Sequence, residues 1–209
     1  MSARSDAAAR DLDRAWLARA VRVLLNPREV FAALRDDSQR AAHAREEPIT
    51  ALVILAGISA VLWTPVAGTV MNDPDYDGLL VAVWAFIGGG FYGVAGYWVC
   101  GALLYGVGRL LGGAASFRQA RHLVAFAAAP IALSLFVVWP ARLAVYGGDL
   151  FRSGGADRGT GDALFAALEL AFVAWSLALL ALGVRLVYRS RTSPASRASK
   201  SASSSSGIE

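Results

Sequence analysis

The feature that most constrains the fold of this chain is the length of its uncharged segments. A transmembrane helix needs about 20 predominantly apolar residues to cross a hydrocarbon core of about 30 Å. A hydrophobic fraction of 56% is also high for a soluble domain. We therefore predict an all-α, polytopic membrane protein whose main partner is the lipid bilayer. The segments with at most one Asp, Glu, Lys or Arg are Ile49–Met71, Leu79–Gly108, Leu123–Ala141 and Ala163–Val184.

These segments predict about four transmembrane spans. The second is unusually long, because a helix of about 33 residues extends for about 50 Å at the usual rise per residue. It can be accommodated by tilting or by a break at the glycines 88–90. A fifth span is the less favoured alternative, because two crossings would need about 40 residues. The expected spans are about residues 49–70, 79–111, 122–145 and 162–188.

The distribution of arginine predicts the orientation of the spans. Arginines precede span one and follow spans two and four, whereas the loop 72–78 has three aspartates and no Lys or Arg. Cytoplasmic loops are enriched in Lys and Arg. We therefore expect a multi-pass protein with both termini in the cytosol. Its preference for Arg over Lys and its short loops favour a bacterial plasma (cell inner) membrane. The same arginines account for the net charge of +4 without nucleic acid as a partner.

Residues 1–47 are predicted to form cytosolic amphipathic helices. Apolar residues recur at helical spacing between Leu12 and Leu24, and arginines take other positions. This helix either lies on the membrane surface or packs on the protein's own cytosolic face. Residues 26–37 predict a second helix, and residues 38–47 a charged linker before the first span. The candidate membrane-surface residues are Arg14, Trp16, Arg19 and Arg22.

No residue pattern for catalysis or metal binding is present in the sequence. His43 and His122 lack the spacing of metal ligands, and Cys100 is the single cysteine. Nucleophile elbows and phosphate-binding loops are also missing from the sequence. We therefore expect a protein that is not an enzyme and has no cofactor.

Two sets of residues inside the spans are candidates for helix contacts. Gly89, Gly93 and Gly108 are small residues that let helix backbones approach closely. Arg142 and Glu169 fall at similar depth in antiparallel spans, and charges at such depth usually find a partner. They either form an ion pair, or Arg142 extends outward and Glu169 meets water or hydroxyl groups.

The loop after span two carries a distinctive motif. Gly112-Gly113-Ala-Ala is followed by Ser116-Phe117-Arg118-Gln119, and an apolar run then leads to Pro130. This order resembles the Yip1 domain family, whose bacterial members have a span ending in Leu-Gly-Gly, an ASFRQ-like loop and an apolar run ending in Pro. Residues 26–34 resemble the family's short segment before its first span. The likeness divides the chain into the N-terminal helices 1–47, a Yip1-like transmembrane domain 48–190 and a disordered Ser-rich tail 191–209.

The resemblance implies a fold but supplies no catalytic residue. Eukaryotic members bind Rab-type GTPases and shape or sort vesicles, and no such traffic is expected in a bacterium. One function is a membrane scaffold that binds a protein partner through the N-terminal helix and the loop 112–119. The other is a transporter or permease subunit that uses Arg142 and Glu169. The packing glycines also permit a homo-oligomer.

Overall fold

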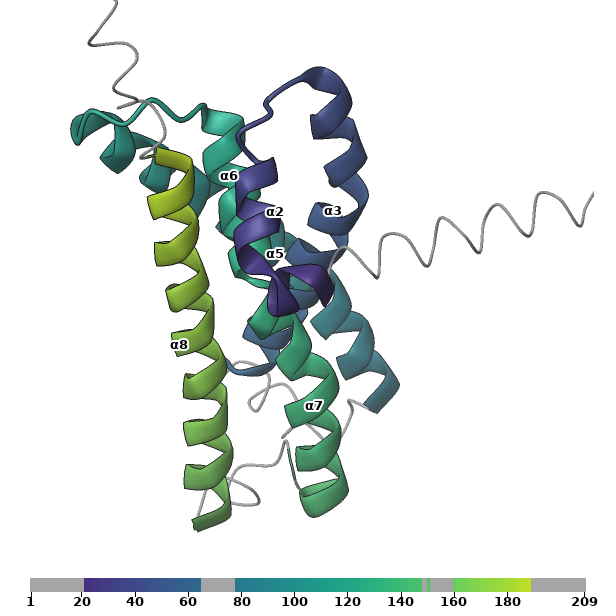
Figure 1. Ribbon diagram of the computed structural model, residues 1–209. Coiled ribbons are helices and arrows are strands. Elements are labelled where there is room, and N and C mark those ends of the chain that lie inside the picture. Colours follow the sequence, from purple (N-terminus) through teal and green to yellow (C-terminus); the bar gives the residue numbers. More distant parts are fainter. Residues whose placement is uncertain (1–20, 65–77, 148–149, 151–159, 189–209) are drawn as a thin grey trace, which may run out of the picture.

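The described part of the chain is a bundle of helices. The computed structural model describes residues 21–64, 78–147, 150 and 160–188 (Figure 1). No strand occurs within these ranges, and residues 21–25 are also helical. The predicted all-α class is therefore confirmed. The helices are α2 (Pro27–Ala33), α3 (Gln39–Leu62), α5 (Gly78–Leu110), α6 (Phe117–Ala127), α7 (Ala129–Tyr146) and α8 (Thr160–Tyr188).

Three helical segments are long and apolar enough to cross a membrane. They are Ala82–Leu110, the α6–α7 segment Phe117–Tyr146, and Thr160–Tyr188. These segments coincide with the predicted spans two, three and four, so the chain is a multi-pass membrane protein. The predicted first span, 49–70, is described only as far as Thr64. A count of four crossings therefore stays a prediction.

Neighbouring helices run in opposite directions, so their ends gather at two levels. The beginnings of α3 and α6 lie at one end of the bundle with the last residues of α5 and α8 (top of Figure 1). We call this the upper end. The end of α3 lies at the opposite, lower end with the end of α7 and the beginning of α8. This arrangement matches the alternating directions expected from the sequence.

α3 begins earlier than the sequence predicts. Residues 39–47, expected to be a linker, form the first turns of this helix, and Pro48 lies inside it. Ser38 caps the helix, because its hydroxyl accepts a hydrogen bond from the backbone N–H of Ala41 at 3.3 Å. The density of charge suggested a linker, but charged side chains are compatible with a helix wherever they project into water. His43 and Glu46, for example, are both exposed and lie within 3.0 Å of each other on the helix surface.

The predicted third span consists of two helices. α6 ends at Ala127 and α7 begins at Ala129, so the chain bends at Ala128. Pro130 lies in the first turn of α7, where its missing N–H removes no intrahelical hydrogen bond. The bend lets α6 pack against α3, α5 and α8 near the upper end.

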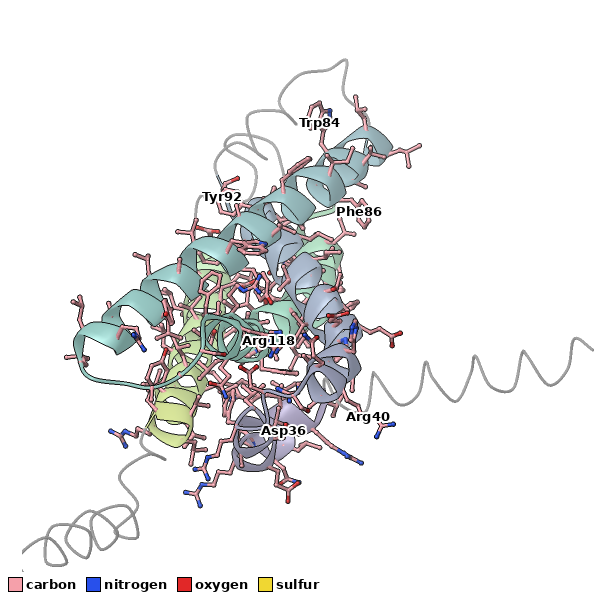
Figure 2. All side chains as sticks on the ribbon, turned by 90° about the horizontal axis from the view of Figure 1, so that it is seen from above. Asp36, Arg40, Trp84, Phe86, Tyr92 and Arg118 are labelled. Atoms are coloured by element: carbon pink, nitrogen blue, oxygen red, sulfur yellow. The ribbon has the colours of Figure 1, made fainter. Side chains whose placement is uncertain are left out.

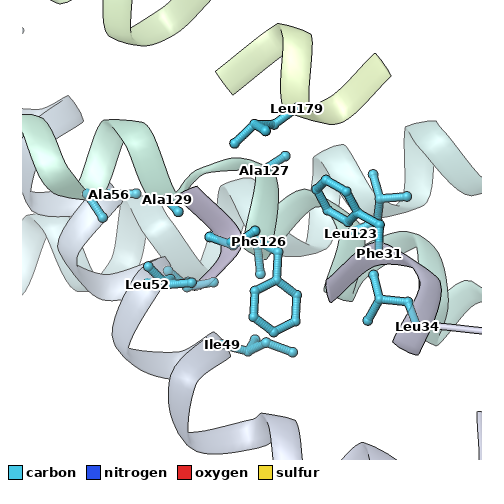
Figure 3. Packing of buried hydrophobic residues seen from close by; sticks show 14 of the residues in the cluster. Phe31, Leu34, Ile49, Leu52, Ala56, Leu123, Phe126, Ala127, Ala129 and Leu179 are labelled. Atoms are coloured by element: carbon cyan, nitrogen blue, oxygen red, sulfur yellow. The ribbon is translucent and has the colours of Figure 1, made fainter. Parts of the chain in front are cut away.

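The buried core lies between α2 and the upper halves of α3, α6 and α8. Phe31, Leu34 and Leu123 have no exposed surface, and Phe126 is 3% exposed (Figure 3). Apolar burial contributes about 25 cal/mol per Å² of surface removed from water. The short N-terminal helix α2 is thus an integral part of the bundle. Further members of this core are Ile49, Leu52, Ala56, Ala127, Ala129 and Leu179.

α5 is a continuous helix that crosses the others obliquely at the edge of the bundle (Figure 1). The alternative of a break at the glycines 88–90 is therefore not seen. α5 packs on α3 and α6, and its other faces leave large apolar side chains exposed to lipid. Three of them are Trp84, Phe86 and Phe91, with 55%, 62% and 77% of their surface exposed.

Glycines bring α3 and α5 into backbone contact. A Cβ atom at Gly57 would lie 2.0 Å from the carbonyl oxygen of Gly89 and 2.6 Å from the backbone nitrogen of Gly93. A Cβ at Gly93 would lie 2.2 Å from the carbonyl oxygen of Val53. Two of the predicted packing residues, Gly89 and Gly93, are thus placed where the helices meet. Gly57 is their counterpart on α3, and the sequence analysis did not select it.

Candidate functional site

The turn after α5 positions the motif loop. Gly112 has a φ of 77°, which an L side chain rarely adopts. Its N–H donates to the carbonyl of Arg109 at 3.0 Å, and the N–H of Gly113 donates to that of Gly108 at 2.7 Å. This pair of bonds is the Schellman motif, which ends a helix and reverses the chain. The glycine pair therefore ends α5 and leads into α6.

The same turn receives the end of α8. Cβ atoms at Gly108 and Gly113 would lie 2.1 Å and 2.4 Å from the ring of Tyr188. The Tyr188 hydroxyl donates a hydrogen bond to the carbonyl of Leu104 at 3.2 Å. The predicted packing residue Gly108 therefore accommodates an aromatic ring rather than another helix backbone.

Ser116 and Gln119 form a capping box at the start of α6. The Ser116 hydroxyl accepts from the N–H of Gln119 at 3.1 Å, and the Gln119 side-chain oxygen accepts from the N–H of Ser116 at 2.8 Å. These two bonds satisfy two donors that the first turn of a helix otherwise leaves unpaired. The motif spacing Ser-x-x-Gln is the sequence signature of this arrangement.

The amide of Gln119 also holds the N-terminal segment. Its nitrogen donates to the carbonyl oxygens of Leu34 at 3.0 Å and Arg35 at 3.3 Å. Both carbonyls lie just after α2, where a helix end lacks partners for its last carbonyl groups. One side chain therefore caps the beginning of α6 and the end of α2 together.

Arg118 binds the turn between α2 and α3. Its Nε donates to the Asp37 carboxylate at 2.7 Å, and its Nη2 donates to the Asp37 carbonyl. Burial opposes ionisation of Asp37, but hydrogen bonds from Arg118 and Ser116 outweigh that effect and hold its pKa below the usual value. Figure 2 looks down on the upper end and shows Arg118 near its centre, with Asp36 close by. We call Asp37, Arg118 and Gln119 the polar clamp.

Two further arginines extend this network. The guanidinium group of Arg35 donates to the carbonyl of Leu186 near the end of α8, at 3.2 Å from Nε and 3.0 Å from Nη2. The Nη2 of Arg45 donates to the carbonyl of Asp36. The segments at the upper end are therefore held together mainly by side chains that donate hydrogen bonds to backbone carbonyl groups of neighbouring segments.

Arg121 lies among aromatic rings where α6 packs against α5. Its guanidinium carbon is 3.9 Å from the ring centroid of Trp98, 4.8 Å from that of Phe117 and 5.2 Å from that of Tyr97. Such cation–π contacts are worth about 0.5 to 2 kcal/mol. The motif residue Phe117 thus packs against Arg121, and both residues are partly buried.

A buried polar cluster joins α3, α7 and α8 nearer the lower end. The hydroxyl oxygens of Ser59 and Ser134 are 2.9 Å apart, and the Trp139 indole donates to Ser59 at 3.4 Å. The Glu169 carboxyl is directed toward Ser134 and the Trp63 side chain, and only 4% of Glu169 is exposed. The hydroxyl contact of Glu169 was one of the two alternatives left open by the sequence.

The predicted ion pair between Arg142 and Glu169 is not formed. Arg142 instead binds Asp162, with 3.2 Å between Nη2 and Oδ1. Asp162 is seven residues before Glu169, so it lies on the same face of α8 two turns closer to the lower end. The Arg142 side chain reaches this more exposed carboxylate, which lowers the cost of its own desolvation.

We expect a charge exchange to distinguish the two pairings. Asp162→Asn should lower the stability of the protein in detergent by about 1 kcal/mol, because Asp162 is partly exposed. The double exchange Arg142→Asp with Asp162→Arg should recover most of that loss. The corresponding double exchange Arg142→Glu with Glu169→Arg should recover none of the lost stability. Thermal melting of the purified variants measures both effects, and rescue by the second exchange alone would contradict the observed pairing.

Other predicted site residues are distributed around the bundle. Arg14, Trp16 and Arg19 lie outside the described residues, and Arg22 is exposed and lines the groove described below. Asp37, Arg121 and Asp162 were not among the predicted site residues. Asp37 could have been noticed as an acidic residue just before a helix start, and Asp162 by its seven-residue spacing from Glu169. Two partners of Arg121, Tyr97 and Trp98, had no such signal because they lie on a different helix, whereas Phe117 lies four residues earlier on α6.

Two hollows accompany these networks. A groove of about 520 Å³ at the upper end lies between α2 and α3, with Phe126 of α6 also in its wall. A cavity of about 360 Å³ lies among the membrane helices and is lined mainly by apolar residues. The lining of this cavity includes Cys100 and Ser176 but neither Arg142 nor Glu169. Within the described residues, no three His, Cys, Asp or Glu side chains gather as metal ligands would.

Comparison with known proteins gives one match. A family model described as the Yip1 domain matches residues 21–199. This range includes the polar clamp, the buried polar cluster and all six helices named above. No curated protein and no solved structure is significantly similar to the chain.

Proposed function

The chain belongs to the Yip1 domain family, and from this premise we propose that it is a non-enzymatic membrane scaffold that binds a protein partner at its upper end. The upper end lies in the cytosol in this proposal, because arginines of α3, α5 and α6 gather there. The membrane is the plasma membrane, with both termini on its cytosolic side. The observation that carries the proposal is the groove between α2 and α3.

The groove has the composition of a peptide-binding surface. Its wall combines apolar side chains, such as Val30 and Phe126, with charges of both signs, such as Glu29 and Arg45. Aromatic and aliphatic surface supplies binding energy, and charges at the rim select the partner. The motif loop 112–119 is a weaker candidate, because the side chains of its last four residues already bind other parts of the protein.

Filling the groove tests this function. Ala33 lines the groove and is exposed, whereas its neighbour Ala32 is also exposed but does not line the groove. We expect Ala33→Trp to reduce cross-linked capture of a partner from native membranes at least about tenfold, since a loss of about 1.4 kcal/mol is tenfold in affinity. Ala32→Trp should capture the same partner at the wild-type level. Mass spectrometry with quantitative labelling compares the captured proteins.

The captured proteins show whether the partner binds at the groove, and whether the partner is another protein or a further copy of the chain. Equal capture by both tryptophan variants would remove the groove from partner binding. Capture of only further copies of the chain would replace the proposed partner by a homo-oligomer. Both variants must reach the membrane in wild-type amounts, which is expected because each substituted side chain is on the surface.

A transporter or permease subunit is the second candidate, and the burial of Glu169 favours it. Buried ionisable residues in membrane spans often mark pathways for ions. The apolar lining of the cavity among the helices favours the scaffold. Proteoliposomes that contain the purified protein should show no solute or ion flux above empty liposomes if the scaffold is the function. Flux that is lost in Glu169→Gln would instead establish transport.

A further inference from the structure

Among the residues that the structure describes, Glu169 has no cationic partner inside the bundle. It lies in the third turn of α8, and its Oε1 has no hydrogen-bond partner among these residues. The charged groups nearby are Arg142 on α7 and Asp162 on α8, and these bind each other. On α3, the Trp63 side chain approaches Glu169 directly, and Ser59 is connected to Glu169 through Ser134. Neither of these two α3 side chains is charged. Each helix packed around Glu169 therefore offers neutral groups or an arginine that is already paired.

The hydrogen bonds of Ser134 determine what it offers to Glu169. A serine hydroxyl has a single hydrogen to donate and two lone pairs that accept. The Ser134 hydroxyl donates that hydrogen to the carbonyl of Ile131, one turn earlier in α7, at 2.9 Å. The neighbouring Ser59 hydroxyl then fills one lone pair of Ser134. What remains for Glu169 is the second lone pair, which is an acceptor.

An acceptor facing a carboxyl group favours the protonated form of that group. A carboxylate has only acceptors, so it would repel the Ser134 lone pair, whereas a carboxylic acid can donate its O–H to it. Burial acts in the same direction, because an ionised carboxylate without a partner is costly in an apolar environment. The geometry at Ser134 and burial thus agree, and both act against the Trp63 indole, which is a donor and favours the carboxylate.

We propose that Glu169 is a reversible proton-binding site within the membrane, with the Ser134 hydroxyl as its switchable partner. In the protonated state the carboxyl donates to Ser134. When the proton passes to water, the carboxylate remains, and the Ser134 O–H rotates away from the Ile131 carbonyl to donate to it. No bond other than the O–H bond of Glu169 is broken, and the ligand of the site is a proton.

Chemical labelling with dicyclohexylcarbodiimide tests the proposal on the wild-type chain in lipid nanodiscs. A protonated carboxylic acid adds across a C=N bond of this apolar reagent, and the product rearranges to a stable N-acylurea that retains the whole reagent. We expect an adduct on Glu169 at about pH 5 to 6 that declines at least about fivefold by about pH 9, as the proton dissociates. Asp162 is the matched control on the same helix, and its pairing with Arg142 should keep it unlabelled throughout.

Two variants complete the experiment. Glu169→Gln keeps the shape and is uncharged, so it should fold with the wild-type melting temperature and give no adduct in α8. Ser134→Ala removes a hydroxyl that binds both forms and binds the carboxylate more strongly, so it should raise the pH at which labelling is half maximal. Absence of an adduct on Glu169 at every pH would overturn the proposal, and so would labelling that does not vary with pH. A Glu169→Gln protein that no longer folds would also overturn it, because a neutral carboxyl should tolerate its isostere.

Discussion

Gly93→Ala is expected to prevent stable packing of α5 against α3, whereas Gly90→Ala, three residues earlier on the same helix, should be tolerated. A Cβ at Gly93 would lie 2.2 Å from the carbonyl oxygen and 3.0 Å from the carbonyl carbon of Val53. Both atoms belong to the backbone, so relief requires the two helices to separate along their whole contact. Overpacking of a core typically costs about 1 to 3 kcal/mol and sometimes more, and we expect the upper end of that range.

The control follows from the geometry of α5. A Cβ at Gly90 would meet no atom within 4 Å. Alanine is favoured over glycine in a helix by about 1 kcal/mol, so Gly90→Ala should leave the melting temperature unchanged or raise it slightly. The amount of monodisperse protein in mild detergent and its thermal melting measure both variants. If Gly93→Ala behaves like Gly90→Ala, the backbones of α3 and α5 are farther apart than the distances at Gly93 indicate.

A reciprocal substitution on α3 strengthens this test. A Cβ at Gly57 would lie 2.0 Å from the carbonyl oxygen of Gly89, so Gly57→Ala should be as damaging as Gly93→Ala. Small residues drive helix association in membranes because the apolar solvent gives no preference for burying apolar side chains. If Gly57→Ala is harmless while Gly93→Ala is not, the defect lies in α5 alone and not in the contact between the helices.

The fold class and the positions of three spans could be predicted because they depend on local composition. Absence of charge over a span, the glycine pair at 112–113 and the Ser-x-x-Gln spacing all act within a few residues. The beginning of α3 was predicted less well. Charged residues occur both in linkers and in helices outside the membrane, so they do not mark where such a helix begins. Pro130 lies at the bend between α6 and α7, and its effect on the backbone is likewise local.

The candidate site was harder to predict, because its contacts join distant parts of the chain. Arg118 and Asp37 are 81 residues apart in sequence, and nothing local to either residue indicates the other. The motif loop was therefore interpreted as a surface for partners, although Arg118 and Gln119 bind the N-terminal segment. Asp162 and Glu169 lie on the same face of α8, so either could have paired with Arg142. Arg142 pairs with Asp162, the more exposed carboxylate, which lies nearer the lower end.

The second large effect is expected from Gln119→Glu, which should release the N-terminal segment while α6 stays folded. The glutamate still accepts a hydrogen bond from the N–H of Ser116, so the capping box is retained. At the position of the amide nitrogen it places a carboxylate oxygen against the carbonyls of Leu34 and Arg35. Two hydrogen bonds at 3.0 Å and 3.3 Å are thus replaced by repulsion, with a loss of about 1 to 3 kcal/mol.

Limited proteolysis of the protein in detergent can measure this release. We expect cleavage between α2 and α3 to accelerate by about tenfold or more in Gln119→Glu, since a change of about 1.4 kcal/mol in local opening is tenfold in population. Gln39→Glu makes the same chemical change at an exposed residue in the first turn of α3, where a negative charge is favourable, and should leave the rate unchanged. Because the core residues Phe31 and Leu34 depend on this attachment, the groove should also lose its shape in Gln119→Glu. Wild-type cleavage in this variant would mean that apolar burial alone retains α2 and that the amide of Gln119 only caps α6.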